Sequence, residues 1–285
     1  MRDFKTNLVA ARSVSCSMSD WIEKSLSKAR LEYYSMFVAS TGSDTDWPEL
    51  RSKAFQLHEW NSKLSEAMYR PLQFFEITIR NVLADKLKDE YGPYWYTSSD
   101  WKSAKIQRFV KAAAKRAKDY QHSRNIKHDA IVSNSNFALW IKLLNPRDSW
   151  DLWNKHWSKI LVSNGVIEEG QRYTNHVNEI FEVTIAVSEL RNLILHYQPI
   201  FDLQEVYKNS NNKKYKALSL KTLPKHFEEL TIVLGWFSPK ARNHIEDQYL
   251  ATVRDVWIKE CPEWYEQYRK GNFEFRSRPE NSNTI

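Results

Sequence analysis

Long stretches of this chain contain neither glycine nor proline, and their apolar residues recur every three or four positions. Only six glycines and nine prolines are spread over 285 residues. β-Sandwiches and barrels need frequent tight turns, so this sparse punctuation favours helices. Apolar residues at helical spacing indicate the same structure. The sequence therefore predicts an all-α protein.

The clearest helical pattern lies between Phe181 and Phe201. Its apolar residues follow one another at steps of three and four, which places them on one face of a helix. Pro199 cannot continue a helix and disfavours helical angles at the residue before it, so we expect the helix to end near Tyr197 or Gln198. The members of the predicted apolar face are Val183, Val187, Leu190, Ile194, Tyr197 and Phe201.

A second, polar stripe follows the same helix. Thr184, Ser188 and Asn192 stand at i, i+4 and i+8, and Arg191 and His196 flank them on the helical wheel. Small side chains would let another helix approach closely, with a guanidinium and an imidazole bordering the contact. Spacing alone leaves a surface helix with an incidental histidine as an alternative.

The segment ELRNLILH at 189–196, followed by Pro-Ile-Phe at 199–201, resembles the arginine–(four to six residues)–histidine motif of HEPN ribonucleases. In particular it resembles the form found in the Abi-like (abortive infection) family. The segments EWN at 59–61 and FEITIRN at 75–81 resemble that family's first long helix. One difference is that the family often has His-Glu directly after the motif histidine, where this chain has Tyr-Gln. The resemblance implies a HEPN-like helical bundle with additional flanking helices.

The resemblance also implies an activity, a metal-independent endoribonuclease without a cofactor. In such a site His196 would act as general base or acid, since imidazole exchanges protons near neutral pH. Arg191 would stabilise the phosphate in the transition state with a permanent, forked charge. Asn192 would orient His196 or bind a phosphate oxygen. Attack by the ribose 2′-hydroxyl would leave 2′,3′-cyclic phosphate and 5′-hydroxyl ends.

The implied partners follow from the same family. Two motif helices meet across a two-fold axis in similar HEPN enzymes, so the resemblance implies a homodimer with a composite site. The substrate would be RNA, cut in anti-phage abortive infection or by a toxin, with an antitoxin or another defence-system component as a further partner. A catalytically inactive RNA-binding module and a protein-interaction module stay open as alternatives.

Charge points to a polyanionic partner as well. The formal net charge is +7 and the pI is near 9.1, a balance that favours nucleic acid without specifying a fold. The segment 102–118 carries seven lysines and arginines and no acid, so it predicts either a solvated surface or a track for phosphates. Arg80 follows Glu76 at i+4, which predicts an ion pair. The candidate RNA-binding residues are Arg80, Lys105, Arg108, Lys111, Lys115 and Tyr197.

The chain is expected to form one all-α domain over 20–270, between an N-terminal extension (1–19) and a disordered tail (271–285). Pro71 is expected to kink a long helix or to open a second one. Two distant cysteines make no disulfide framework, and no signal peptide or membrane span is expected, so the predicted location is cytoplasmic. The expected helices are 20–38, 49–91, 101–119, 132–144, 147–163, 168–197, 220–237 and 241–257.

Overall fold

The computed structural model describes residues 24–42, 46–98, 103–121, 126–149, 173–210, 217–218 and 220–273. Regular structure within these ranges is helical and includes no strand, which confirms the all-α prediction. The helices in chain order are α2 (Lys28–Ser40), α3 (Trp47–Tyr91), η1 (Trp95–Thr97), α4 (Ala104–Gln121), α5 (His128–Asn134), α6 (Phe137–Leu144), α8 (Tyr173–Leu195), α9 (Leu203–Ser210), α10 (Leu223–Phe237), α11 (Pro239–Ile245), η4 (Glu246–Leu250), α12 (Ala251–Lys259) and η5 (Glu263–Tyr268).

Helix α3 is the central element and contains 45 residues, which corresponds to about 68 Å at 1.5 Å per residue. Its start is capped by Asp46, whose Oδ1 accepts a hydrogen bond of 3.0 Å from the backbone N–H of Glu49. Its end is marked by Gly92 at φ 80°, where glycine avoids the steric cost of a left-handed residue. The helix continues through Pro71, which rules out the alternative that Pro71 opens a second helix.

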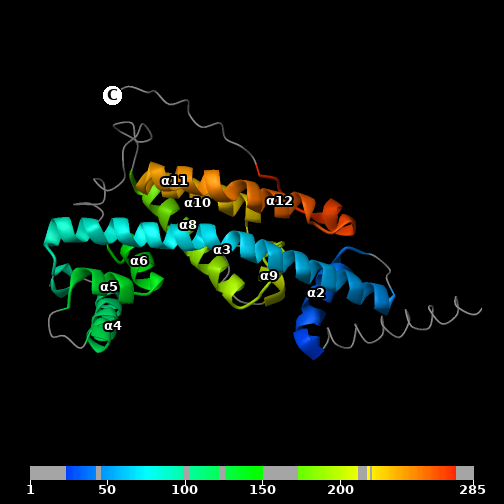
Figure 1. Cartoon of the computed structure of the whole chain (residues 1–285), viewed down its shortest axis with the longest axis horizontal. Helices are drawn as coiled ribbons and strands as arrows, with labels where there is room; N and C mark the ends of the chain where they lie inside the picture. Colours follow the sequence, from blue (N-terminus) through cyan, green and yellow to red (C-terminus); the bar gives the residue numbers. More distant parts are fainter. Residues whose placement is uncertain are drawn as a thin grey trace, which may run out of the picture.

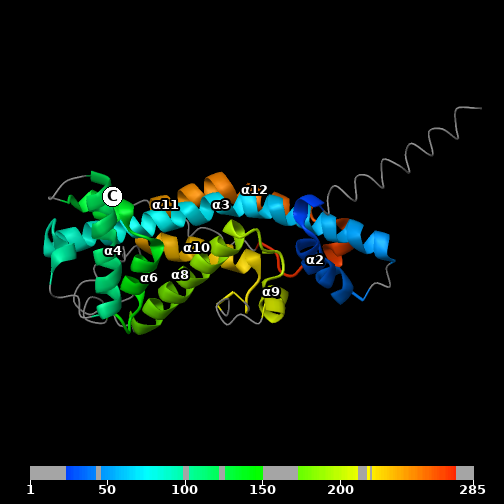
Figure 2. The same ribbon diagram turned by 90° about the horizontal axis from the view of Figure 1, so that it is seen from below.

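The other helices are arranged along α3 (Figures 1 and 2). Helix α2 packs against one end of α3, and α4, α5 and α6 lie at the other end. Helix α8 crosses the middle of α3 and packs against α10, and α10, α11 and α12 each contact α3 as well. Helix α6 packs against both α4 and α8. The basic helix α4 and the motif helix α8 therefore flank the same short helix.

Aromatic side chains fill the core where α2, α3 and the segment after α8 meet. The ring centroid of Phe201 lies 5.0 Å from that of Phe37 and 5.7 Å from that of Trp60. The indole N–H of Trp60 donates to the backbone oxygen of Val256 at 2.9 Å, which ties α3 to α12. The interpretation that tryptophans fill gaps between helices is confirmed for the fully buried Trp60, Trp95, Trp140 and Trp257.

The predicted helix 132–144 is wrong as a single element. Helix α5 ends at Asn134 and α6 begins at Phe137, with two extended residues between them. The side chain of Asn136 accepts a hydrogen bond from the backbone N–H of Leu139 at 3.3 Å and caps α6. A two-residue break does not disturb the apolar period, so the pattern alone missed it. Helix α9 was not predicted, and most of the predicted helix 147–163 lies outside the described residues.

The C-terminal part of the described chain packs beyond the predicted domain boundary at 270. The indole N–H of Trp257 donates to the backbone oxygen of Gly271 at 3.1 Å. The ring of Phe273 lies 5.7 Å from that of Phe227. Residues 271–273 therefore belong to the packed domain rather than to the tail. The predicted extension 1–19 and residues 274–285 lie outside the described residues.

A helix that crosses a membrane must be long and apolar. No helix in the described ranges has both properties.

Candidate functional site

Helix α8 presents the predicted apolar face to the core, with one exception. Val183, Val187, Leu190 and Ile194 are all buried. Tyr197 is 70% exposed, so its predicted place on this face is wrong. The reason is that α8 ends at Leu195, two residues before the earliest predicted position.

The end of α8 has the hydrogen bonds of a Schellman motif. The N–H of Tyr197 donates to the backbone oxygen of Ile194 at 3.0 Å, and the N–H of Gln198 donates to that of Leu193 at 2.8 Å. Tyr197 adopts φ 54°, the left-handed conformation that this motif requires. His196 directly precedes this residue, and its backbone N–H still donates to the oxygen of Asn192 at 3.0 Å. The imidazole is thus carried on the last turn of the helix, where it is exposed.

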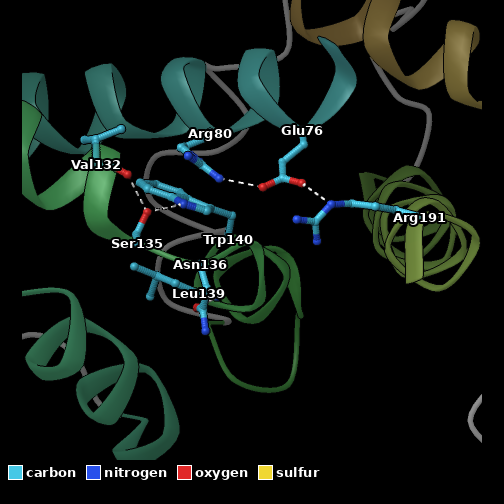
Figure 3. Close-up of polar contacts among 8 residues, drawn as sticks. All are labelled: Glu76, Arg80, Val132, Ser135, Asn136, Leu139, Trp140 and Arg191. Atoms are coloured by element: carbon cyan, nitrogen blue, oxygen red, sulfur yellow. Dashed lines mark hydrogen bonds and ion pairs between the residues drawn. The ribbon is translucent and has the colours of Figure 1, made fainter. Parts of the chain in front are cut away.

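Arg191 is attached to α3 through a shared carboxylate (Figure 3). Its Nε lies 3.2 Å from Oε2 of Glu76, and Oε1 of Glu76 lies 2.5 Å from Nη2 of Arg80. Glu76 is 8% exposed, so one nearly buried carboxylate holds two guanidiniums. The predicted Glu76–Arg80 ion pair is confirmed. With two positive charges and one negative charge, the cluster has an excess of one positive charge to offer an anion.

The recorded contact of Arg191 with Glu76 is made by Nε and not by a terminal nitrogen. In Figure 3 one terminal nitrogen points away from α3, and the other points sideways, along α3. The side chain is 35% exposed. Within the described ranges, the structure records no hydrogen bond from these two nitrogens. A guanidinium that is anchored through Nε still has its two terminal nitrogens to bind a phosphate in a bidentate way.

The small-residue stripe of α8 is only partly accessible. Thr184 is 0% exposed, and its hydroxyl donates to the backbone oxygen of Ile180 at 2.7 Å. The prediction that Thr184 offers a face for another copy is therefore wrong, because helices of the same chain cover it. Ser188 and Asn192 are half-buried. A second copy could approach only towards the C-terminal end of α8.

The predicted basic face of α4 is oriented outwards. Ile106, Val110, Ala113 and Ala117 are buried. On the wheel, Arg108, Lys111 and Lys115 lie opposite these residues, and Lys105 and Lys118 lie to either side. The Nζ of Lys105 is 3.9 Å from Oδ1 of Asp148, a distance that leaves only a weak interaction. The exposed candidate cations are Lys105, Arg108, Lys111 and Lys115. Exposure alone is compatible with a phosphate track and with a solvated surface.

Two residues with clear roles at the site were not predicted. Glu76 was expected to pair with Arg80, but not to reach Arg191. Asn61 of α3 clamps the chain that leaves α8: its Oδ1 accepts from the N–H of Ile200 at 2.7 Å, and its Nδ2 donates to the oxygen of Gln198 at 3.3 Å. Each contact joins segments that are far apart in sequence. The only earlier signal was that these segments all resemble the same family.

The fold and the site define an all-α protein with an arginine, an asparagine and a histidine on the last turns of one helix. A comparison with protein-family models, curated proteins and solved structures finds no match to this chain. The resemblance to the Abi-like family therefore depends on the quoted segments. Among the described residues, no group of three or more His, Cys, Asp or Glu side chains is arranged to hold a metal ion.

Proposed function

We propose that this protein is a metal-independent endoribonuclease of the Abi-like/HEPN type, acting in anti-phage defence or as a toxin. The observation that supports the proposal is how the guanidinium of Arg191 is held. Its Nε is held by the nearly buried Glu76, its terminal nitrogens have no recorded hydrogen bond among the described residues, and the exposed His196 follows five residues later on the last turn of the same helix. Cleavage of a ribose-phosphate chain requires a fixed cation and an accessible imidazole at one phosphate, which in this proposal the two copies of α8 in a dimer supply together.

The proposed reaction is an internal transesterification. His196 accepts the proton of a ribose 2′-hydroxyl, and the 2′-oxygen forms a bond to the adjacent phosphorus. The bond from phosphorus to the 5′-oxygen breaks, and that oxygen takes up a proton to become a 5′-hydroxyl. Arg191 stabilises the negative charge on the phosphoryl oxygens. DNA lacks the 2′-hydroxyl and would not be cut.

Binding would be supported by the exposed cations of α4. Contacts from lysine and arginine to phosphates give affinity that does not depend on sequence and that falls with salt. Arg80 contributes indirectly in this proposal, because its guanidinium helps to hold Glu76 in place beside Arg191.

The proposal predicts loss of cleavage without loss of binding. Purified wild type, His196→Ala and Arg191→Ala are incubated with total RNA, and new 5′-hydroxyl ends are sequenced. We expect His196→Ala to reduce the cleavage rate by at least about 100-fold, the usual contribution of a general acid–base group. His244→Ala, which removes another exposed histidine on α11, is the matched control and should cut like wild type.

Two results would contradict this function. If wild type shifts RNA on a gel and never cuts it, the chain is a catalytically inactive RNA-binding module. If it has no affinity for RNA at all, a protein-interaction role is favoured.

The proposed homodimer would use the accessible end of α8. Leu195 is 46% exposed and Tyr197 is 70% exposed, so two large side chains flank His196 at the surface. Burying them against a second copy would bring two motif histidines together. We expect Leu195→Asp to shift sedimentation from dimer to monomer and to abolish cleavage, whereas Ile258→Asp, at another exposed apolar residue, should change neither. A wild type that cuts RNA as a monomer would contradict the composite site.

A further inference from the structure

A groove with a volume of about 910 Å³ lies between α2 and α12, over the middle of α3. Ile194 and Tyr197, from the end of α8, form part of its wall. Arg191 and His196 do not line it, so it is separate from the candidate active site but starts beside it. Its size falls in the range of about 300–1,000 Å³ that small-molecule sites occupy.

The floor of the groove is a polar face of α3. Residues on one face of a helix recur at steps of three and four, and at this point the face bears polar side chains where a helix packed among others is usually apolar. The members of this face are His58, Asn61, Ser62, Ser65 and Tyr69.

One hydroxyl at the floor lacks a hydrogen-bond partner among the described residues. It is the buried Oγ of Ser65. The hydroxyl of Tyr34, on the adjacent α2, is 1% exposed and lies beside the amide of Asn61. Burial raises the pKa of Tyr34 more strongly than the contact with Asn61 lowers it, so this hydroxyl stays neutral. Buried polar groups without partners are rare, and a polar ligand would supply what Ser65 lacks.

Two guanidiniums of the groove have no ion pair with an acid among the described residues. Lys63 pairs with Glu260 at 2.6 Å across the groove. Within the described ranges neither Arg30 nor Arg70 has an ion-pair partner, and the guanidinium of Arg30 lies 5.4 Å from the ring centroid of Tyr197. The N–H groups of a guanidinium without an acidic partner can bind the oxygens of a phosphate group in a bidentate way.

Aromatic rings stand next to these cations. Tyr69 is 40% exposed on the rim, and Tyr249 faces the groove from the π-helical turn Glu246–Leu250. Such turns within α-helices frequently occur at functional sites. Exposed tyrosine rings are platforms on which nucleobases stack.

We propose that this groove binds a nucleotide, with the phosphate between Arg30 and Arg70 and the base on the ring of Tyr69. The nucleotide is a free molecule or one unit of an RNA strand, because the recognised chemistry is the same. The proposal does not depend on the proposed cleavage reaction.

The test is calorimetric titration of the full chain carrying His196→Ala, so that any cleavage cannot disturb the RNA measurement. The probes are AMP, UMP, inorganic phosphate and a ten-nucleotide RNA. We expect Arg70→Ala and Tyr69→Ala each to weaken nucleotide binding about tenfold, in line with one phosphate contact or one stacked base. Tyr69→Phe keeps the ring and should bind like the parent. Arg147→Ala, at an exposed arginine on the turn after α6, should also leave binding unchanged.

The two sources of the nucleotide give different results. Binding of AMP or UMP that depends on Arg70 indicates a site for free nucleotides. If the RNA binds, the mononucleotides do not, and the binding of the RNA depends on Arg70, the groove binds one nucleotide of an RNA strand. The proposal is overturned if no probe binds, if Arg30→Ala and Arg70→Ala both bind like the parent, or if phosphate binds as tightly as AMP and Tyr69→Ala changes nothing. A thermal melt of each variant confirms that it is folded.

Discussion

At the scale of single residues, Glu76 connects the two arginines of the site. Its carboxylate pairs with both Arg80 and Arg191, at 2.5 Å and 3.2 Å. The neutral variant Glu76→Gln keeps the shape of the side chain but leaves two guanidiniums facing one another. We expect the free energy of unfolding to fall by about 2 kcal/mol, less than the ~3–5 kcal/mol typical of a fully buried pair, because Arg191 reaches solvent.

Urea unfolding of wild type and Glu76→Gln measures this loss. The control is Glu66→Gln at an exposed position of the same helix, which should stay within about 0.5 kcal/mol of wild type. If Arg191 acts on RNA, Glu76→Gln should also cut more slowly under conditions where it is fully folded. A variant as stable and as active as wild type would show that Glu76 does not position Arg191.

At the scale of elements, the end of α8 depends on one residue in an unusual conformation. Tyr197 has φ 54°, and such angles cost non-glycine residues roughly 1–2 kcal/mol. Tyr197→Gly and Tyr197→Ala both lose the contact between the ring and Arg30. The difference between their free energies of unfolding therefore measures the cost of the left-handed backbone conformation. We expect Tyr197→Gly to be more stable than Tyr197→Ala by about 1 kcal/mol.

The same pair of substitutions at Lys111 is the control for this comparison. Lys111 is exposed in the interior of α4, where Ala should be more stable than Gly by about 1 kcal/mol. Thermal melts of the four variants are sufficient. Equal stability of the two variants at 197 would mean that α8 does not end in solution as described.

The helices that could be predicted are those whose signal lies within the helix itself. Val183, Val187, Leu190 and Ile194 repeat over several turns, and the core buries all four. The break at Asn136 was missed because a side-chain cap interrupts the helix without changing the apolar period. Tyr197 was assigned to the apolar face because spacing gives no information about a left-handed residue.

The candidate site could be predicted only in part, for a related reason. Arg191 and His196 lie five residues apart, so sequence spacing places both on the last turns of one helix, about 140° apart around its axis. The carboxylate that holds Arg191 comes from another helix, and no periodicity links it to α8. The groove is assembled from α2, α3, α8 and α12, so its polar floor becomes visible only when those helices are packed.

At the scale of the whole molecule, the structure separates three kinds of surface. Helix α4, with its exposed cations, lies at one end of α3, and α2, which forms one wall of the groove, lies at the other end (Figure 1). The end of α8, with Arg191 and His196, belongs to the helix that crosses the middle. In the proposed function, an RNA strand that contacts α4 would be extended past the cleavage site towards the groove.

Three partly or fully buried histidines make the stability of the whole chain depend on pH. Burial lowers the pKa of His58, His128 and His226. For His128 burial outweighs the opposite effect of Asp129. The indole N–H of Trp95 donates to Nδ1 of His128 at 2.7 Å, which requires the neutral ring.

The unfolded chain binds protons at these histidines near pH 6.5, and the folded chain binds them only at lower pH. The stabilisation is therefore complete above about pH 6.5 and is lost as the pH falls towards the folded values, at up to about 1.4 kcal/mol per pH unit for each histidine. Urea unfolding at pH 7.5 and pH 5.5 measures the loss. His128→Gln keeps an oxygen that can accept the hydrogen bond from Trp95 and cannot be protonated, so its loss between the two pH values should be smaller. A His128→Gln profile parallel to that of wild type would mean that His128 is protonated as easily in the folded protein as in the unfolded chain.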